Sequence, residues 1–168
     1  MRPLEGVRVV DFSTLLPGPM AGLILAEAGA EVIKVERPKV GEDARYNIPR
    51  FGDDASVNFA LLNRGKRSVA VDLKDPDSVE AMKRLIASAD IVLEQFRPGV
   101  MDRLGLGYEA LRAVNSSLIY CAITGYGQSG PKANFAAHDL NYVADTGLLG
   151  LAADRTGAPV VPHALVAD

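Results

Sequence analysis

The chain has 168 residues, of which 48% are hydrophobic and 23% charged, and its 18 basic and 21 acidic residues give a formal net charge of −3. This is the composition of an ordinary globular protein, so disordered and fibrous classes are excluded, and the acidic excess gives no case for binding nucleic acid. The longest apolar stretch, residues 20–26, is too short to cross a membrane, and the first residues do not have the charged-then-apolar pattern expected of a leader. With the single Cys121, these features predict a cytoplasmic protein in a reducing compartment.

Strand and helix patterns alternate along the first two thirds of the chain. Residues 7–12 and 31–36 are rich in β-branched residues, and the Ala- and Leu-rich stretch 20–28 between them predicts a helix and hence a βαβ unit with parallel strands. A long polar loop is expected over residues 38–55. Further strands are expected at 68–72, 91–96 and 118–123, and further helices at 77–89 (capped by Asp75), 100–104 and 108–114. The pattern predicts an α/β fold, an open and mainly parallel sheet of Rossmann-like βαβ units flanked by helices.

Residues 118–123 form a nearly continuous apolar run, which predicts a strand buried on both faces with Cys121 as a small buried hydrophobe. The last third of the chain differs in its sequence pattern. It contains a glycine-rich stretch, residues 124–134, and a predicted helix over residues 139–151 with Asp139 as its cap. An apolar run that we expect to end a strand then leads directly to Asp168 without a stop or turn signal. We therefore expect residues 1–168 to be a single α/β domain cut from a larger protein.

Basic residues recur after the predicted strands, where open parallel sheets bind anionic ligands. Arg37 follows the second strand, Lys74 the third, and Arg97 and Arg103 the fourth. Guanidinium groups suit phosphate because their planar fork makes bidentate contacts. Each residue alone is more simply explained as a solvated surface charge, but their recurrence predicts a phosphate-binding edge.

Gly125, Gly127 and Gly130 satisfy the spacing G-x-G-x-x-G after a predicted strand. In a dinucleotide-binding turn the third glycine packs inside a helix that has already begun, whereas here Pro131 follows and the helical pattern resumes only near His138. We therefore expect no NAD site, and interpret the glycines as letting a mobile loop pass close to another group. A helix N-terminus would favour the neutral form of His138, although a structural role is the simpler interpretation from the residues alone.

Four motifs occur in order along the chain: LEGVRVVDFSTLLPGPMAGLILAEAGAEVIKVERP, LNRGKRSVAVDLK, EQFRPGVMDRLGLGYEALRAVN, and YCAITGYGQSGP followed by HDLNY. Together they resemble the family III CoA-transferases, which include formyl-CoA transferase, carnitine CoA-transferases and α-methylacyl-CoA racemase. The resemblance covers the whole chain and implies an enzyme that acts on acyl-CoA and a carboxylic acid acceptor, without metal or NAD. It also implies that the chain is the N-terminal, CoA-binding part of a longer two-domain polypeptide that forms an interlocked homodimer.

The resemblance also assigns roles to individual residues. It implies that Asp168 is the catalytic aspartate and that His138 matches the histidine that works with this aspartate in the racemases. Phe96 and the backbone of residues 71–73 would pack against the adenine and its ribose, and the arginines would meet phosphate oxygens. The implied CoA contacts are Leu16, Pro17, Arg37, Val71, Asp72, Leu73, Lys74, Gln95, Phe96, Arg97 and Arg103.

Three functions remain open from the sequence. In a transferase, the Asp168 carboxylate attacks the donor thioester and an aspartyl-CoA thioester follows. In a racemase, His138 and Asp168 flank the α-carbon and exchange its proton through an enolate. In the third, the chain is an inactive truncated fragment that still binds CoA, because the oxyanion donors and the acyl pocket would lie beyond Asp168. The block that begins EQFRPGVMDRLG favours the transferase.

Overall fold

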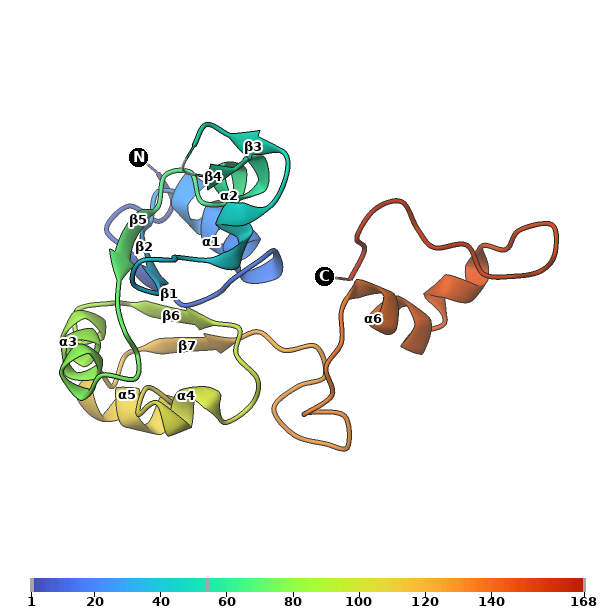
Figure 1. Cartoon of the computed structure of the whole chain (residues 1–168). Coiled ribbons are helices and arrows are strands. Elements are labelled where there is room, and N and C mark those ends of the chain that lie inside the picture. Colours follow the sequence, from blue (N-terminus) through green and yellow to red (C-terminus); the bar gives the residue numbers. More distant parts are fainter. Residues whose placement is uncertain (1, 54, 168) are drawn as a thin grey trace. The chain divides into compact units, whose positions relative to one another are not determined.

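The computed structural model describes residues 2–53 and 55–167, so Asp168 lies outside the described residues. The chain divides into two compact units, Met1–Ile123 and Thr124–Asp168, and each is described by itself. The first unit contains a five-stranded sheet in the order β5-β2-β1-β6-β7, with every neighbouring pair parallel (Figure 1). The predicted α/β fold is therefore confirmed. The strands are β1 (Arg8–Asp11), β2 (Glu31–Glu36), β5 (Arg67–Ala70), β6 (Ile91–Glu94) and β7 (Ile119–Ala122).

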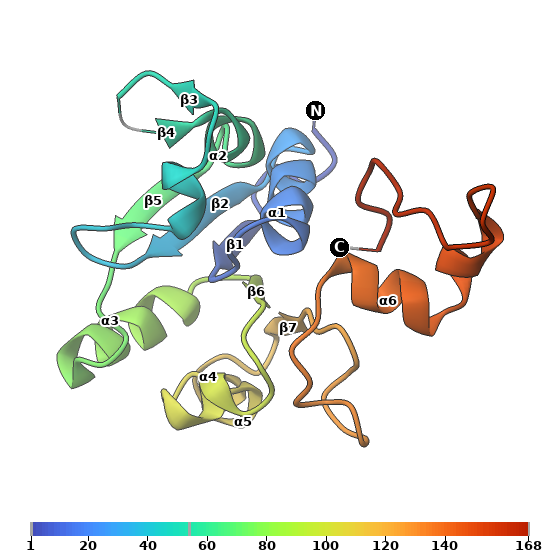
Figure 2. The same ribbon diagram turned by 45° about the vertical axis from the view of Figure 1, so that its right-hand side comes forward.

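Helices cover both faces of this sheet (Figure 2). On one face, α1 (Pro17–Glu27) packs Leu25 and its neighbours against Val9 and Val32 of the strands. On the other, Val10 and Val92 pack against α3 (Pro76–Ile86), α4 (Val100–Arg103) and α5 (Tyr108–Val114). Because both faces are covered, the middle of a central strand carries adjacent apolar residues, such as Val9 and Val10 of β1, rather than a strict alternation.

Helix α1 begins at Pro17, earlier than the predicted start at residue 20. The sequence Pro17-Gly18-Pro19 was expected to be a loop, but proline suits the first turn of a helix because its fixed φ is helical and its missing N–H needs no partner there. Gly18 is required by close packing, since a Cβ at this position would lie 2.1 Å from the Cβ of Ser13. The loop between β1 and α1 is therefore short and tightly packed.

Strand β7 is more exposed than its sequence predicted. It lies at the edge of the sheet, with Ile119 60% exposed and Cys121 also exposed, so the prediction of a strand buried on both faces is wrong. A continuous apolar run does not reveal which strand ends a sheet, because neighbour order is a property of the tertiary structure. The predicted cap of α3 is confirmed, with Asp75 Oδ2 accepting from the Ser78 N–H at 3.0 Å.

The segment between β2 and β5 has more structure than the polar loop predicted over residues 38–55. Ser56 accepts from the Phe59 N–H at 2.9 Å and so begins α2. The segment therefore forms a small cap of its own on the side of α1 and β5 (Figure 1). Its elements are η1 (Asp43–Tyr46), the antiparallel pair β3 (Arg50–Phe51) and β4 (Ala55–Ser56), and α2 (Val57–Leu62).

The second unit contains α6 (Asp139–Asp145) and η2 (Leu148–Leu151), so the helix predicted over 139–151 is divided in two. Gly147, with φ 79°, ends α6. Residues 164–167 are described and form no strand, contrary to expectation. None of the helices within residues 2–53 and 55–167 has the length and apolar character that crossing a bilayer requires.

Candidate functional site

The parallel sheet brings the predicted CoA-contacting segments to one edge. Residues 16 and 17 follow β1, Arg37 follows β2, residues 71–74 follow β5, and residues 95–97 follow β6. Because the carboxyl ends of parallel strands share one edge, the fold places these four segments along it. The chain runs from β1 to one side of the sheet and later returns to β6 on the other, so β1 and β6 flank the switch point where such sheets bind ligands.

The four predicted phosphate-binding side chains, Arg37, Lys74, Arg97 and Arg103, are all exposed. Arg37 makes an ion pair with Asp43, and its Nε donates to the Gly41 carbonyl oxygen at 3.1 Å. Among the ion pairs of residues 2–53 and 55–167, none involves the other three. These cations are therefore accessible to an anionic ligand, and Arg37 is already oriented.

Gln95, a predicted CoA contact, has a structural partner. Its Oε1 accepts from the Gly18 N–H at 3.0 Å. This hydrogen bond ties the first turn of α1 to the segment that follows β6 and so joins the two sides of the switch point. Phe96 is partly buried and packs against the core under α3 and α4, so only part of its surface is free for a ligand.

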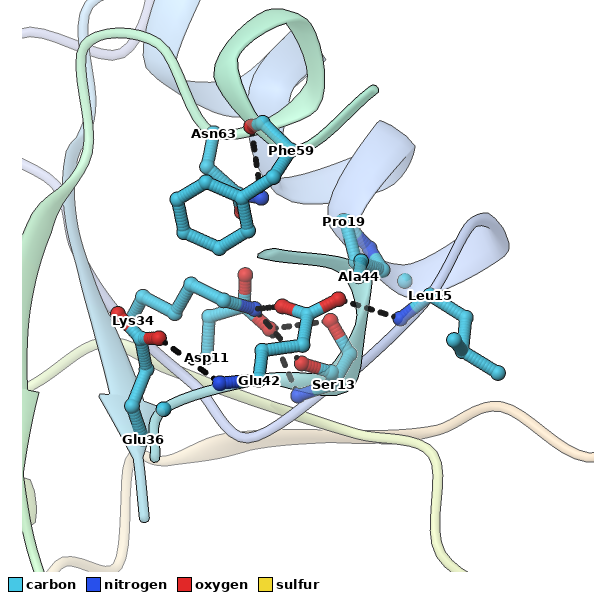
Figure 3. A network of polar contacts seen from close by, with 12 residues as sticks. Asp11, Ser13, Leu15, Pro19, Lys34, Glu36, Glu42, Ala44, Phe59 and Asn63 are labelled. Atoms are coloured by element: carbon cyan, nitrogen blue, oxygen red, sulfur yellow. Dashed lines mark hydrogen bonds and ion pairs between the residues drawn. The ribbon is translucent and has the colours of Figure 1, made fainter. Parts of the chain in front are cut away.

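The sequence analysis missed a buried network of charged groups beneath the β1–α1 loop (Figure 3). Lys34 Nζ lies 2.5 Å from Glu42 Oε2, and each side chain is only 1% exposed. Lys34 also donates to the Ser13 carbonyl oxygen at 2.9 Å, and Glu42 Oε1 accepts from the Leu15 N–H at 2.6 Å. A lysine inside the apolar strand EVIKVE was the available signal, because a charge in a doubly covered strand needs a buried partner.

A second buried pair lies beside the first. Lys66 Nζ is 3.0 Å from Asp11 Oδ2 and also donates to the carbonyl oxygen of Pro19 at 2.9 Å. Burial lowers the pKa of Lys66, and the Asp11 carboxylate opposes this shift. Asp11 Oδ1 accepts from the backbone and side chain of Ser13. The absence of a side chain at Gly22 of α1 leaves space for this pair, since a Cβ there would lie 2.7 Å from Asp11 Oδ2.

Glu36 anchors the segment that follows β2. Its two carboxylate oxygens each accept from Arg45 at 2.7 Å, and they also accept from the Ser68 hydroxyl at 2.6 Å and the Glu42 N–H at 3.1 Å. Burial alone would raise the pKa of Glu36, but the hydrogen bonds from Arg45 and Ser68 outweigh it and lower the pKa from 4.5 to about 2. The Arg45 guanidinium lies 3.9 Å from the centre of the Phe59 ring.

This arrangement predicts acid sensitivity. Because the folded pKa of Glu36 is below its ordinary value, its contribution to stability is complete above pH 4.5 and is lost as the pH falls toward 2. The shift corresponds to up to about 3 kcal/mol. We expect the free energy of unfolding in urea to fall less between pH 6 and pH 2.5 for Glu36→Gln than for the wild type. For Glu80→Gln, which changes an exposed side chain, it should fall as much as for the wild type. Equal losses in all three proteins would contradict this prediction.

In the second unit, His138 is exposed and is itself the N-cap of α6, so the expectation that Asp139 caps this helix is wrong. The Asn141 Oδ1 accepts from the His138 N–H at 3.0 Å. Asp139 is buried instead, and its Oδ1 accepts from the N–H groups of Val166 and Ala167 at 2.7 and 2.6 Å. A carboxylate at the start of α6 therefore holds the backbone of the two residues that precede Asp168.

The glycine-rich stretch packs on α6. A Cβ at Gly125 would lie 2.1 Å from Tyr142 Oη, so this glycine allows the close approach that was expected of the stretch. A Cβ at Gly127 or Gly130 would meet no such close neighbour, so the expectation is confirmed for Gly125 alone. The next helix begins only at Asp139, and no helix continues from Gly130 as in a dinucleotide turn. Tyr126 donates to Asp145 Oδ2 at 2.5 Å, and this hydrogen bond raises the pKa of Tyr126 to about 12. A cavity of about 270 Å³ lies here, lined by Thr124, Gly125, Tyr126, Tyr142, Asp145, Thr146 and Ala167.

Within residues 2–53 and 55–167, no group of three or more His, Cys, Asp and Glu side chains is placed to hold a metal ion.

Comparison with known proteins gives consistent matches. Residues 4–168 match CoA-transferase family III. Succinyl-CoA:glutarate CoA-transferase of Mus musculus is 44% identical over 168 residues, which are 100% of this chain and 38% of the mouse protein. Alpha-methylacyl-CoA racemase of Homo sapiens is 41% identical over 165 residues, which are 98% of this chain and 39% of the human protein.

A solved structure agrees with these sequence matches. The crystal structure of a CAIB/BAIF family protein from Brucella suis has a TM-score of 0.90 and 39% identity, over 97% of this chain and 44% of that chain. The chain thus spans about two fifths of the length of the relatives it matches.

Proposed function

Because the chain belongs to CoA-transferase family III, we propose that the enzyme of which it is part moves CoA from an acyl-CoA donor to a carboxylic acid acceptor. The observation that carries this proposal is the shared carboxyl edge of the parallel sheet, where exposed cations follow β2, β5 and β6. Arg37, Lys74, Arg97 and Arg103 would neutralise the phosphates of CoA there. Leu16, Pro17, Phe96 and residues 71–73 would contact its less polar parts.

In the proposed reaction, Asp168 is the nucleophile. Its carboxylate attacks the donor thioester carbonyl, which forms a mixed anhydride and releases the CoA thiolate. The thiolate then attacks the aspartyl carbonyl carbon, so the donor leaves as a carboxylate and an aspartyl-CoA thioester remains. An acceptor carboxylate attacks this thioester, releases the thiolate and forms a second anhydride. Attack of the thiolate on the acceptor carbonyl completes the transfer and regenerates the Asp168 carboxylate.

The second unit supports this role for Asp168. Asp139 accepts hydrogen bonds from both backbone N–H groups of Val166 and Ala167. The backbone of Val166 and Ala167 is thereby attached to α6. An attachment next to the proposed nucleophile would lower the orientational entropy that is lost in the transition state.

The test is to trap the intermediate. The complete enzyme is incubated with acyl-CoA, treated with hydroxylamine or borohydride, and digested for mass spectrometry. A modification on Asp168 that requires acyl-CoA is the expected result. A modification on a different carboxylate, or none under conditions of turnover, would count against the proposal.

Racemisation is the second candidate, favoured by the similarity to alpha-methylacyl-CoA racemase and by the exposure of His138 at the N-terminus of α6. In that reaction, His138 and Asp168 would exchange the α-proton on opposite faces of a thioester enolate. Loss of α-deuterium from a 2-methylacyl-CoA, without an acceptor acid and without an adduct on Asp168, would establish racemisation instead of transfer. CoA binding without either reaction by the 168-residue chain is the third outcome.

CoA binding can be tested with one variant and a matched control. Arg37 and Arg64 are both more than half exposed, and each is paired with one carboxylate, Asp43 and Glu27 respectively. Only Arg37 follows the carboxyl end of a strand. We expect Arg37→Ala to raise the Kd for CoA about tenfold, since a charge-assisted hydrogen bond is worth roughly 1.5–3 kcal/mol before the cost of competing with Asp43.

We expect Arg64→Ala to leave the Kd for CoA unchanged. Titration calorimetry of both variants at one ionic strength makes the comparison, because screening by salt weakens contacts to phosphate. If the two variants change the Kd for CoA equally, Arg37 is not a specific CoA contact.

A further inference from the structure

The short turn between β1 and α1 adopts a backbone conformation that its sequence does not favour. Leu15 has a φ of 65°, in the left-handed region that leucine rarely adopts. Leu15 is 44% exposed and belongs to neither of the two hydrophobic clusters found among the described residues. The conformation therefore needs support from other groups, and the structure contains such groups directly beneath the turn.

Two buried charged side chains hold this turn from below (Figure 3). Glu42 Oε1 accepts from the Leu15 N–H at 2.6 Å, and Lys34 Nζ donates to the Ser13 carbonyl oxygen at 2.9 Å. The ion pair between Lys34 and Glu42, at 2.5 Å, links the two contacts. The backbone is thus fixed on both sides of Thr14 by side chains from β2 and from the segment that follows it.

Stability alone does not account for a buried ion pair here. A pair of this kind is often replaced by apolar residues of similar size without loss of stability, because desolvation offsets its Coulombic attraction. Both Lys34 and Glu42 direct a polar atom to the backbone of the turn, and that turn leads straight into Leu16 and Pro17 beside the switch point. The arrangement determines the shape of the turn.

We propose that Lys34 and Glu42 are positioning residues for CoA binding, which hold the β1–α1 turn in the conformation that receives the CoA thioester. This inference rests on the proposed function, in which the turn is part of the CoA site. Neither residue touches CoA in this proposal, since both side chains are 1% exposed. They act through the backbone of residues 13–15.

The first test replaces both members of the pair. Lys34→Met/Glu42→Met fills the same space with apolar side chains and removes both hydrogen bonds to the turn. We expect a smaller loss of thermal stability than in Lys34→Met alone, because neither charge of the pair is left without its partner, and a Kd for CoA raised about tenfold in titration calorimetry. Glu42→Gln retains an acceptor oxygen for the Leu15 N–H, so we expect it to bind CoA more tightly than the double variant does.

A second substitution tests the mechanism of the effect. Glycine reaches the left-handed region without steric cost, so adding Leu15→Gly to the double Met variant should recover part of the lost CoA affinity. Ile86→Ala is the control for a general loss of stability, because Ile86 is fully buried under the opposite face of the sheet. We expect it to lower the melting temperature and leave the Kd for CoA unchanged.

Amide hydrogen exchange supplies a readout that needs no ligand. The Leu15 N–H should exchange slowly in the wild type and in Glu42→Gln, and faster in the double Met variant. If the wild type does not bind CoA, the proposed function fails while hydrogen exchange still tests the support of the turn. Three results would overturn the inference. The double Met variant could bind CoA with wild-type affinity, Ile86→Ala could raise the Kd for CoA as much as the double Met variant does, or the Leu15 N–H could exchange at the same rate in the double Met variant and the wild type.

Discussion

Asp168→Asn in the complete enzyme is expected to lower the rate of CoA transfer about 10⁴-fold or more, because an amide cannot replace a carboxylate that attacks the thioester. The variant should retain the affinity of the wild type for CoA, since the proposed CoA contacts lie on other segments. The rate is measured as formation of the acceptor thioester by liquid chromatography, and the adduct by mass spectrometry of the same samples.

Asp154→Asn is the matched control. Asp154 belongs to the same unit, is exposed, and accepts within its own turn from the Thr156 N–H at 2.7 Å, a contact that an asparagine oxygen can also make. We expect its transfer rate to stay close to that of the wild type. Substantial transfer by Asp168→Asn would show that another group forms the covalent intermediate.

Lys34→Met alone is expected to destabilise the first unit by about 3–5 kcal/mol, because it leaves the Glu42 carboxylate buried without its cation. Glu42 would keep the Leu15 N–H as a donor but lose the charge 2.5 Å from its Oε2. In a domain whose total stability is on the order of 5–15 kcal/mol, a loss of this size is large. Urea unfolding at pH 7 measures it, with an unchanged m-value as the sign that the comparison is valid.

Two further proteins make this prediction specific. Arg64→Ala breaks an ion pair whose side chains are 55% and 52% exposed, and should cost only about 0–1 kcal/mol. Lys34→Met/Glu42→Met removes both buried charges and should recover most of the stability that the single variant loses. A cost for Lys34→Met no greater than that for Arg64→Ala would show that the buried pair is not coupled as the geometry indicates.

The sequence alone was sufficient for the strands of the parallel sheet and most of the helices that cover it, but not for the small elements between β2 and β5. The five strands of the sheet, helix α3 and its cap Asp75 lie where they were predicted, because residue periodicity and capping act over a few neighbouring positions. Parallel βαβ connections then brought the segments around Arg37, Lys74 and Arg97 to one edge, as predicted, since strands that run in the same direction end on the same side.

Only the tertiary structure decided which groups meet across long separations in the chain. Three such contacts are not contained in any local pattern: Glu42 with Leu15, Gln95 with Gly18, and Asp139 with the backbone of residues 166 and 167. The same is true of the exposure of β7, which depends on strand order. Periodicity reports which side of an element is apolar, whereas the partner of a buried charge is selected by the packing of elements that lie far apart in sequence.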